Sequence, residues 1–298
     1  MSYLIRGANE LNGAKKDFLI RDRKIVYKGK NLDHLKSLSM NCGGFHITPS
    51  RVGVDLSIIG NEDGALCKNR FIEWQRIGCT TMLVVCPLES VQNLQELLRK
   101  TRHRMINSSV DYVIGISFPM RKLTPSFVRL CRLEKIPFIF AEIKSEEDLE
   151  GVEWPWIRNE LFSYRLAIVP DTRNFPLQER ALMKWKKHWK TLAAQFDIPT
   201  VVDFTEDEMF LTKEASRKIG ISPFKGELRT GFDVDYNLYE STSLADPLEL
   251  HYDKDSIPDV VVLRGRLMKA GKTVYYRPGF GKEVIVRVPG YLAYYPEN

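Results

Sequence analysis

Side chains that could do chemistry follow several apolar stretches of the sequence, at the points where those stretches end. In chain order they are Asp55, Cys86, Ser117, Glu142, Asp171 and Asp203. If the stretches are parallel strands, their carboxyl ends meet at one edge of a sheet or barrel, and the carboxylates would converge there. Converging carboxylates could bind a hard cation such as Mg²⁺ or Mn²⁺, or a close pair could act as general acid and base.

Helix capping and turn formation are the competing interpretation, because Asp and Ser side chains commonly accept hydrogen bonds from the backbone N–H groups that follow a strand. Asp171 and Asp203 fit such positions. Glu142 differs, since it lies inside the apolar stretch 138–143 and alternation turns it away from its apolar neighbours, in the same direction as Lys144. Glu142 is therefore the strongest candidate for a functional side chain.

Four residues around the same predicted edge are candidates for ligand binding: Ser57, Cys86, Ser117 and Lys144. Cys86 could act as a nucleophile, but no histidine lies near it in sequence. A small, buried hydrophobic side chain is the competing interpretation of this cysteine.

The elements that must position these residues alternate between strand and helix. Continuous apolar runs separated by helices of ten or more residues predict parallel βαβ units covered on both faces. The expected strands are residues 52–59, 80–86, 111–117, 137–143, 164–169 and 199–204, and the expected helices are 67–77, 90–105, 124–134 and 176–196. A further strand could lie in residues 153–161 or around Met209 and Phe210.

Short β-strands are expected at both ends of the chain, including a hairpin at residues 17–27. Each end is too small to bury a core alone, so the simplest arrangement joins them. We expect a composite β-sandwich domain from residues 1–50 and 224–298, beside a β/α barrel domain at 51–223. The β/α section spans about 170 residues against roughly 250 for an eight-fold barrel, which predicts a shortened or distorted TIM-like barrel.

Four stretches follow one another in an order typical of one hydrolase superfamily. They are residues 4–7 with 17–26 (LIRG, DFLIRDRKIV), 46–55 (HITPSRVGVD), 78–85 (GCTTMLVV) and 211–235, which contains KGEL and GFDVD. The sequence resembles the amidohydrolase superfamily, which includes dihydroorotase, dihydropyrimidinase and related cyclic-amide hydrolases. This resemblance implies a (β/α) barrel with a β-sandwich built from both chain ends.

The sequence departs from that family where its members bind metal. In the family, an aspartate on the first barrel strand is followed by an H-x-H pair, whereas here Ser57 and Ile59 occupy the corresponding positions after Asp55. A serine hydroxyl is a poor zinc ligand and isoleucine is none. The five histidines, His34, His46, His103, His188 and His251, all lie away from the predicted carboxyl ends of the strands. We therefore expect no metal at the H-x-H position, and a divalent metal only through carboxylates.

Composition excludes several classes of protein. The chain has 298 residues, with 44 basic and 38 acidic residues giving a net charge of +6, which is small for a nucleic-acid-binding protein. No apolar run is long enough to predict a membrane span or a signal peptide. The five cysteines form no C-x-x-C pair, which favours reduced thiols and a cytoplasmic location. The basic segment 184–190 could bind an acidic partner, but we expect Trp185 and Trp189 to pack on the barrel while its lysines face solvent.

The sequence thus predicts an amidohydrolase-like protein that is catalytically inactive and binds a small molecule or a protein partner at the former active-site edge. The alternative is a hydrolase acting on C–N bonds of a cyclic amide through Asp55, Glu142, Asp171 and Asp203. No cofactor and no membrane are expected, and a homo-oligomer is a further possibility.

Overall fold

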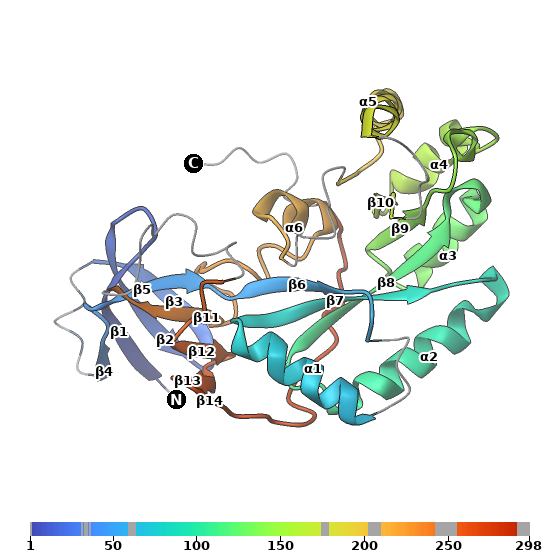
Figure 1. The fold of residues 1–298 in the computed structure, drawn as a ribbon. Helices are drawn as coiled ribbons and strands as arrows, with labels where there is room; N and C mark the ends of the chain where they lie inside the picture. The colour runs from blue at the N-terminus through green and yellow to red at the C-terminus, as the bar shows by residue number, and fades with distance from the viewer. Residues whose placement is uncertain are drawn as a thin grey trace.

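The structure, a computed structural model, describes residues 2–30, 32, 35, 37–58, 64–173, 179–201, 210–241 and 255–290. Its described strands form two sheets, one of nine strands and one of five (Figure 1). The larger sheet contains strands from both ends of the chain, and the smaller one alternates with helices. The chain is therefore of the α/β class that the sequence predicts.

The five-stranded sheet is parallel, and its strands are ordered as they occur in the chain, from β6 to β10. They are β6 (Arg51–Asp55), β7 (Cys79–Pro87), β8 (Asp111–Pro119), β9 (Phe138–Glu142) and β10 (Ala167–Asp171). These confirm five of the expected strands. Of the sixth, Thr200 pairs with Ile168 of β10, whereas residues 202–204 lie outside the described part of the chain.

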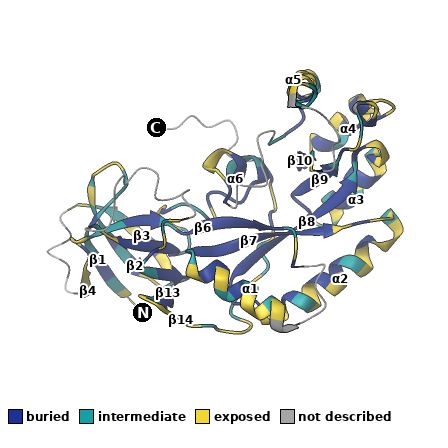
Figure 2. Ribbon diagram, viewed as in Figure 1, coloured by how far each residue is buried: buried dark blue, intermediate teal, exposed yellow. Residues whose placement is uncertain are grey.

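Helices cover one face of the parallel sheet. They are α1 (Gly64–Arg76), α2 (Leu94–Arg104), α3 (Pro125–Leu133), α4 (Trp154–Leu161) and α5 (Glu179–Gln195). Short 3-10 helices lie beside them: η1 (Val91–Asn93), η2 (Met105–Asn107), η3 (Met120–Lys122) and η4 (Glu146–Leu149). Figure 2 shows exposed residues on the outer sides of these helices and buried residues along the strands between them. Thr124 caps α3 by accepting a hydrogen bond from the N–H of Phe127, ahead of Pro125 in the first turn, as the sequence indicates.

The other face of the parallel sheet packs around α6 (Lys213–Ile219). Val54 of β6 and Val169 of β10 lie in one apolar cluster with Ala215 and Ile219 of that helix. A flat five-stranded sheet would hold its two edge strands about 19 Å apart. Because both edges contact the same cluster, the sheet curls around α6 into a half-barrel. We call this inner surface the concave face.

Residues 153–161, which could have formed a further strand, form the helix α4 instead. Trp154, Ile157 and Leu161 are buried at helical spacing, and Pro155 occupies the first turn. The other possible strand was the stretch around Met209 and Phe210, and of this stretch Phe210 pairs with Gly53 at the free edge of β6. Phe210 and Thr200 therefore flank opposite edges of the parallel sheet.

The tryptophans of α5 pack inward, as expected. The rings of Trp185 and Trp189 stack with centroids 6.2 Å apart, both are buried, and Trp189 donates from Nε1 to Oγ1 of Thr200 at 2.9 Å. The exposed residues of the same helix include Lys184, Lys187 and Lys190. This confirms the packing interpretation of the basic segment.

The nine-stranded sheet joins the two ends of the chain. Its strands are β1 (Ser2–Asn9), β2 (Lys15–Arg21), β3 (Lys24–Gly29), β4 (Leu38–Asn41), β5 (Phe45–Pro49), β11 (Tyr236–Glu240), β12 (Val260–Leu263), β13 (Arg266–Ala270) and β14 (Thr273–Val274). The expected hairpin is β2 with β3, and the ends of the chain meet where β5 pairs antiparallel with β11. We call this sheet with its core the satellite unit.

The satellite sheet closes on itself through one segment of chain. The N–H of Ile25 in β3 donates to Phe232 and the N–H of Val234 donates to Arg23, and the same segment continues into β11 beside β5. Residues from β3 and β12 consequently share one apolar cluster, which includes Ile25 and Val262. A single sheet that closes on itself therefore encloses this core. A sandwich was expected here from the sequence.

The last described residues return to the parallel sheet. Glu283 pairs in parallel with Tyr112 of β8, and Val284 and Val286 pack in the apolar cluster of the concave face. Part of the stretch 224–298, which was expected to belong to the satellite unit, thus completes the core of the half-barrel.

A buried ion cluster joins the two units. The ammonium group of Lys225 lies 2.7 Å from Oδ2 of Asp111, 2.9 Å from Oδ2 of Asp233 and 2.7 Å from Oδ2 of Asp235. The guanidinium of Arg264 also pairs with Asp111, and its backbone N–H donates to Oδ1 of Asp235. Asp111 begins β8, whereas the other four residues come from the satellite side of the chain. We call these five residues the junction cluster.

The carboxylates of the junction cluster hold Lys225 in its charged form. Burial by itself would lower the pKa of Lys225, but the carboxylates of Asp235, Asp111 and Asp233 outweigh it, so the pKa lies above its ordinary value. Burial raises the pKa of Asp235, against the opposing effect of Lys225. The Lys225 cation thus stays charged well above neutral pH.

Replacement of Lys225 by methionine should destabilise the fold by about 3–5 kcal/mol, because it removes the ammonium group from three carboxylates and leaves the buried Asp235 without a side-chain cation. Denaturant unfolding at pH 7 measures this change. Lys218→Met is the matched control: Lys218 pairs with Glu214 on the surface of α6 at 2.7 Å, and its loss should cost no more than about 0.5 kcal/mol. Equal effects of the two substitutions would contradict a central role for the cluster.

Gly115 lies in the middle of β8, where a Cβ atom would come within 2.0 Å of the Phe138 ring. Gly115→Ala should therefore destabilise the half-barrel by about 1–3 kcal/mol through overpacking. Gly44→Ala is the control, since a Cβ atom there would have no neighbour within 4 Å and the backbone is not left-handed. Thermal unfolding of both variants checks the difference, which should disappear if Phe138 moves aside without cost.

Candidate functional site

Three of the candidate residues form a polar row on the concave face at the carboxyl edge of the sheet. Ser117 lies two residues before the end of β8, Glu142 ends β9 and Asp171 ends β10. By the alternation of side chains along a strand, each points to the same side of the sheet as the concave-face residues Phe140 and Val169. Glu142 and Asp171 are direct register partners, on strands about 4.8 Å apart. The structure thus brings Ser117, Glu142 and Asp171 together, and we call them the polar row.

Glu142 is held by Ser117 through one carboxylate oxygen. Oγ of Ser117 donates to Oε1 of Glu142 at 2.7 Å, and this serine is almost fully buried. The Glu142 side chain is half-buried, and its Oε2 has no partner among the described residues. Glu142 therefore presents a positioned hydrogen-bond acceptor at the edge of the half-barrel.

Asp171 is neutralised by an arginine two residues further on. Nε of Arg173 lies 2.8 Å from Oδ1 of Asp171, and its terminal nitrogen lies 2.6 Å from Oδ2. The backbone N–H of Arg173 also donates to Oδ1 at 3.2 Å, so the turn role considered for Asp171 is present as well. A forked arginine–carboxylate pair fixes both side chains.

Asp55 faces the other way, towards α1, and does not join the polar row. Its Oδ1 accepts from the backbone N–H and Oγ of Ser57, both at 2.9 Å, and from the N–H of Ile58 at 3.0 Å. Its Oδ2 accepts from Nε of Arg70 at 2.8 Å and from Nε1 of Trp74 at 2.7 Å. The expectation that Asp55 converges with the other carboxylates is therefore wrong, because its strand turns it into the helix layer.

The donors around Asp55 lower its pKa. Burial alone would raise the pKa, but the hydrogen bond from Trp74, the charge of Arg70 and the bonds from Ser57 outweigh it, so the pKa lies below the ordinary value of 3.8. The carboxylate is ionised at neutral pH and is fully occupied as an acceptor.

The residues at the first strand do not fit a metal centre of the kind that the resemblance implies. All five bonds of Asp55 go to protein donors, and the hydroxyl of Ser57 is one of those donors. Ile59 lies outside the described residues. Within the described ranges, no three His, Cys, Asp or Glu side chains gather closely enough to hold a metal ion. We therefore derive no reaction step through a metal here.

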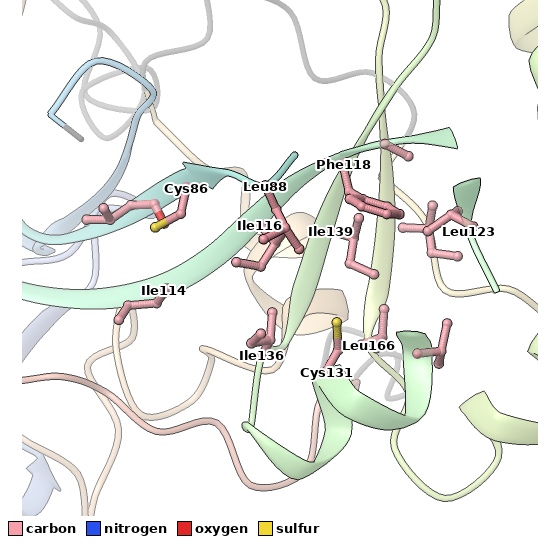
Figure 3. Close-up of a cluster of buried hydrophobic side chains, with 14 of the residues drawn as sticks. Cys86, Leu88, Ile114, Ile116, Phe118, Leu123, Cys131, Ile136, Ile139 and Leu166 are labelled. Carbon is pink, nitrogen blue, oxygen red and sulfur yellow. The ribbon is translucent and has the colours of Figure 1, made fainter. Parts of the chain in front are cut away.

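The remaining candidates are not part of the polar row. Cys86 is buried among apolar side chains beneath the helices (Figure 3), with Sγ 3.2 Å from Oγ1 of Thr101 in α2, and burial raises the pKa of its thiol to about 11. This placement corrects the assignment of Cys86 to the ligand-binding edge, because its parity puts it on the helix-covered face. Lys144 is exposed, and its backbone N–H donates to Asp148. Asp203 lies outside the described residues.

The described histidines lie away from the carboxyl edge, as expected: His46 is in β5, His103 in α2 and His188 in α5. His34 and His251 are not among the described residues. In the part of the chain that the structure covers, no helix has the length and apolar character needed to cross a bilayer.

Sequence reasoning missed Arg173 and the junction cluster. The Asp-x-Arg spacing after β10 was a readable signal, because an arginine two residues beyond a strand-end aspartate can fold back on it. Three members of the junction cluster lie in the stretch KGEL…GFDVD, where the lysine pairs with the two aspartates. Its third carboxylate, Asp111, is more than a hundred residues away, and the sequence gives no sign of it.

Comparison with known proteins yields structural relatives alone. No protein-family model and no curated protein sequence matches the chain. A dihydropyrimidinase from Brevibacillus agri superposes with a TM-score of 0.71 at 10% identity, covering 97% of this chain and 99% of that chain. An L-hydantoinase (dihydropyrimidinase) from Arthrobacter aurescens gives 0.66 at 12% identity, with 95% and 99% covered. A D-hydantoinase from a Bacillus species gives 0.67 at 10% identity, with 96% and 99% covered.

At these identities the likeness shows the fold: a half-barrel with a satellite unit arranged as in the dihydropyrimidinases and hydantoinases. The half-barrel agrees with the shortened barrel that the sequence predicts, whereas the expected sandwich of the chain ends is a single closed sheet. The likeness does not carry the activity of those proteins to this chain, because function depends on the site and not on the fold.

Asp55→Asn should destabilise the protein by about 1–3 kcal/mol at pH 7, because charge-assisted bonds from Arg70 and Trp74 are weakened. A carboxyl group with a lowered pKa stabilises the fold above the ordinary pKa of 3.8 and loses that contribution as pH falls through its folded-state value. The difference between wild type and variant should therefore shrink below about pH 4. Urea unfolding from pH 7 to pH 3 measures it.

The control for this experiment is Glu96→Gln, which removes an exposed pair with Lys100 on α2 and should leave stability essentially unchanged. A difference for Asp55→Asn that stays constant down to pH 3 would show that the carboxylate is not the stabilising species.

Proposed function

We propose that this chain is an amidohydrolase-like protein that binds a small molecule at the polar row without hydrolysing it. The observation that carries the proposal is the geometry of Glu142, which is fixed by Ser117 through Oε1 and keeps Oε2 as an acceptor. Its register partner on the next strand, Asp171, holds the Arg173 cation. Such an acceptor and cation suit a ligand with an N–H group adjacent to a carbonyl, as in cyclic amides and ureides.

Loss of catalysis is inferred from the first strand. The family's metal ligands are replaced there, and the carboxylate of Asp55 is committed to five donors in the helix layer. Activation of water in such hydrolases requires a group that lowers its pKa or accepts its proton. Glu142 is the one described carboxylate of the polar row that is not paired with an arginine, and its Oε1 is occupied by Ser117, so Oε2 is the atom with which it would bind a ligand.

The second candidate function is hydrolysis of a cyclic amide C–N bond by carboxylate chemistry. It is favoured by the register pairing of Glu142 with Asp171, which puts two carboxyl groups side by side on the concave face. A close pair of carboxylates can divide the roles of acid and base. The forked contact of Arg173 with Asp171 opposes this, since it occupies both carboxylate oxygens of Asp171.

Five free cysteine thiols support a cytoplasmic location for the protein, which we infer together with its binding role. The half-barrel also offers the same edge to a protein partner. A small molecule is preferred because the positioned polar atoms lie on the concave side of the sheet and not on its outer helices.

The test is calorimetric titration with hydantoin and dihydrouracil, combined with a chromatographic assay for ring opening in the presence of added Zn²⁺, Mn²⁺ or Mg²⁺. We expect saturable binding of at least one compound and no ring opening above background. Glu142→Ala should weaken binding about tenfold or more through loss of a charge-assisted hydrogen bond.

Glu147→Ala is the matched control, since Glu147 is an exposed carboxylate that lies outside the polar row, and it should leave binding unchanged. Ring opening that depends on Glu142 would establish the second function in place of the first. Absence of binding to both compounds, or binding that is indifferent to Glu142→Ala, would overturn the assignment of the polar row.

A further inference from the structure

A cavity lies at the opposite end of the parallel sheet from the polar row, at the junction with the satellite unit. Its volume is about 390 Å³. Asp111, which lines it, begins β8, whereas Ser117 of the polar row lies six residues further along the same strand, about 20 Å away. A ligand here would therefore be independent of the one proposed above. We call this space the junction cavity.

The floor of the junction cavity is a rigid set of compensated charges. Lys225, Arg264 and Asp111 line it, and each is at least nine-tenths buried. Lys225 pairs with Asp111 and Asp233, and Arg264 pairs with Asp111. Groups fixed in this way need no rearrangement to receive a ligand, which lowers the cost of binding.

One wall of the junction cavity is aromatic and open to solvent. The rings of Phe224 and Phe232 meet edge to face, with centroids 5.5 Å apart. Phe224 is 55% exposed and Ile285 beside the cavity is 47% exposed. Exposed aromatic faces at a cavity are suited to stacking against a planar ring.

The rim carries two cations that no described residue neutralises. Lys24 and Lys282 both line the cavity and are exposed, and neither makes an ion pair with any residue in the described ranges. The acidic residues on the same walls are occupied, since Asp233 pairs with Lys225 and Glu283 pairs with Arg102 at 2.9 Å. The excess charge that a ligand meets is therefore positive.

We propose that the junction cavity binds a small aromatic anion, in which a planar ring lies against Phe224 and Phe232 and an anionic group lies between Lys24 and Lys282. The volume suits a compound of one or two fused rings with a single charged group, such as a nucleoside monophosphate or an aromatic carboxylate. A phosphate and a carboxylate are both anions that can accept hydrogen bonds from the two lysines, and the experiment below distinguishes between them.

The experiment titrates the full-length protein with adenosine monophosphate and 2-naphthoate, and with the uncharged adenosine and 2-naphthamide, by calorimetry at low salt. We expect at least one anion to bind, about tenfold or more tightly than its uncharged counterpart. Inorganic phosphate should bind more weakly than adenosine monophosphate, because it lacks a ring. Tighter binding of adenosine monophosphate than of 2-naphthoate assigns phosphate as the preferred group, and the reverse assigns carboxylate.

The double variant Lys24→Gln with Lys282→Gln should abolish the preference for the anion, and Phe224→Ala should weaken binding of the anion and of its uncharged counterpart. Lys272→Gln removes an exposed lysine of the satellite unit away from the cavity, and it should change nothing. Glu142→Ala should also leave this binding intact, which separates the outcome from that of the polar row. Equal affinity for charged and uncharged forms, no binding by either anion, or binding unaffected by the double variant would overturn the proposal.

Discussion

The ammonium group of Lys225 ties the half-barrel to the satellite unit, and the arrangement of both depends on it. An ammonium ion buried to this degree is unfavourable unless carboxylates surround it, and three do so at hydrogen-bonding distance. One carboxylate, on Asp111, begins the central strand of the parallel sheet, and the others precede β11. The segment that carries them is the same one that bonds to β3 and then to β5, so the cluster fixes both the closure of the satellite sheet and its position on the half-barrel.

The concave face of the half-barrel separates an apolar core from the polar row. The helix α6 and Val286 fill the inner surface of the curled sheet with apolar contacts, and the polar row lies at the carboxyl edge of that surface. There the first strand turns Asp55 into the helix layer, where Arg70 and Trp74 hold it, and the later strands turn Glu142 and Asp171 inward. The edge consequently offers fixed hydrogen-bonding groups for a ligand, while the aspartate of the first strand serves as a structural acceptor.

Much of the fold was readable from apolar runs and their spacing, including five strands of the parallel sheet and the inward packing of Trp185 and Trp189. The direction of Glu142 relative to its neighbours also followed from alternation along its strand. Alternation fixes only relative sides, however, so it could not say which side is concave. For that reason Glu142 and Cys86 were both candidates for the edge, and the structure places them on opposite faces. Residues 153–161 were ambiguous because a short apolar stretch fits a buried helix as well as a strand.

The sequence by itself determined the α/β class, the pairing of both chain ends and the position of Glu142 at a strand end. These depend on residue type and on local periodicity, which are properties of short stretches. Only the tertiary structure decided that Arg173 neutralises Asp171, that Asp55 faces α1, and that Asp111 completes the pocket of carboxylates around Lys225. The physical reason is that buried charges are stable only with partners, and these partners need only be close in space. Asp111 and Lys225 form such a pair although more than a hundred residues separate them in the chain.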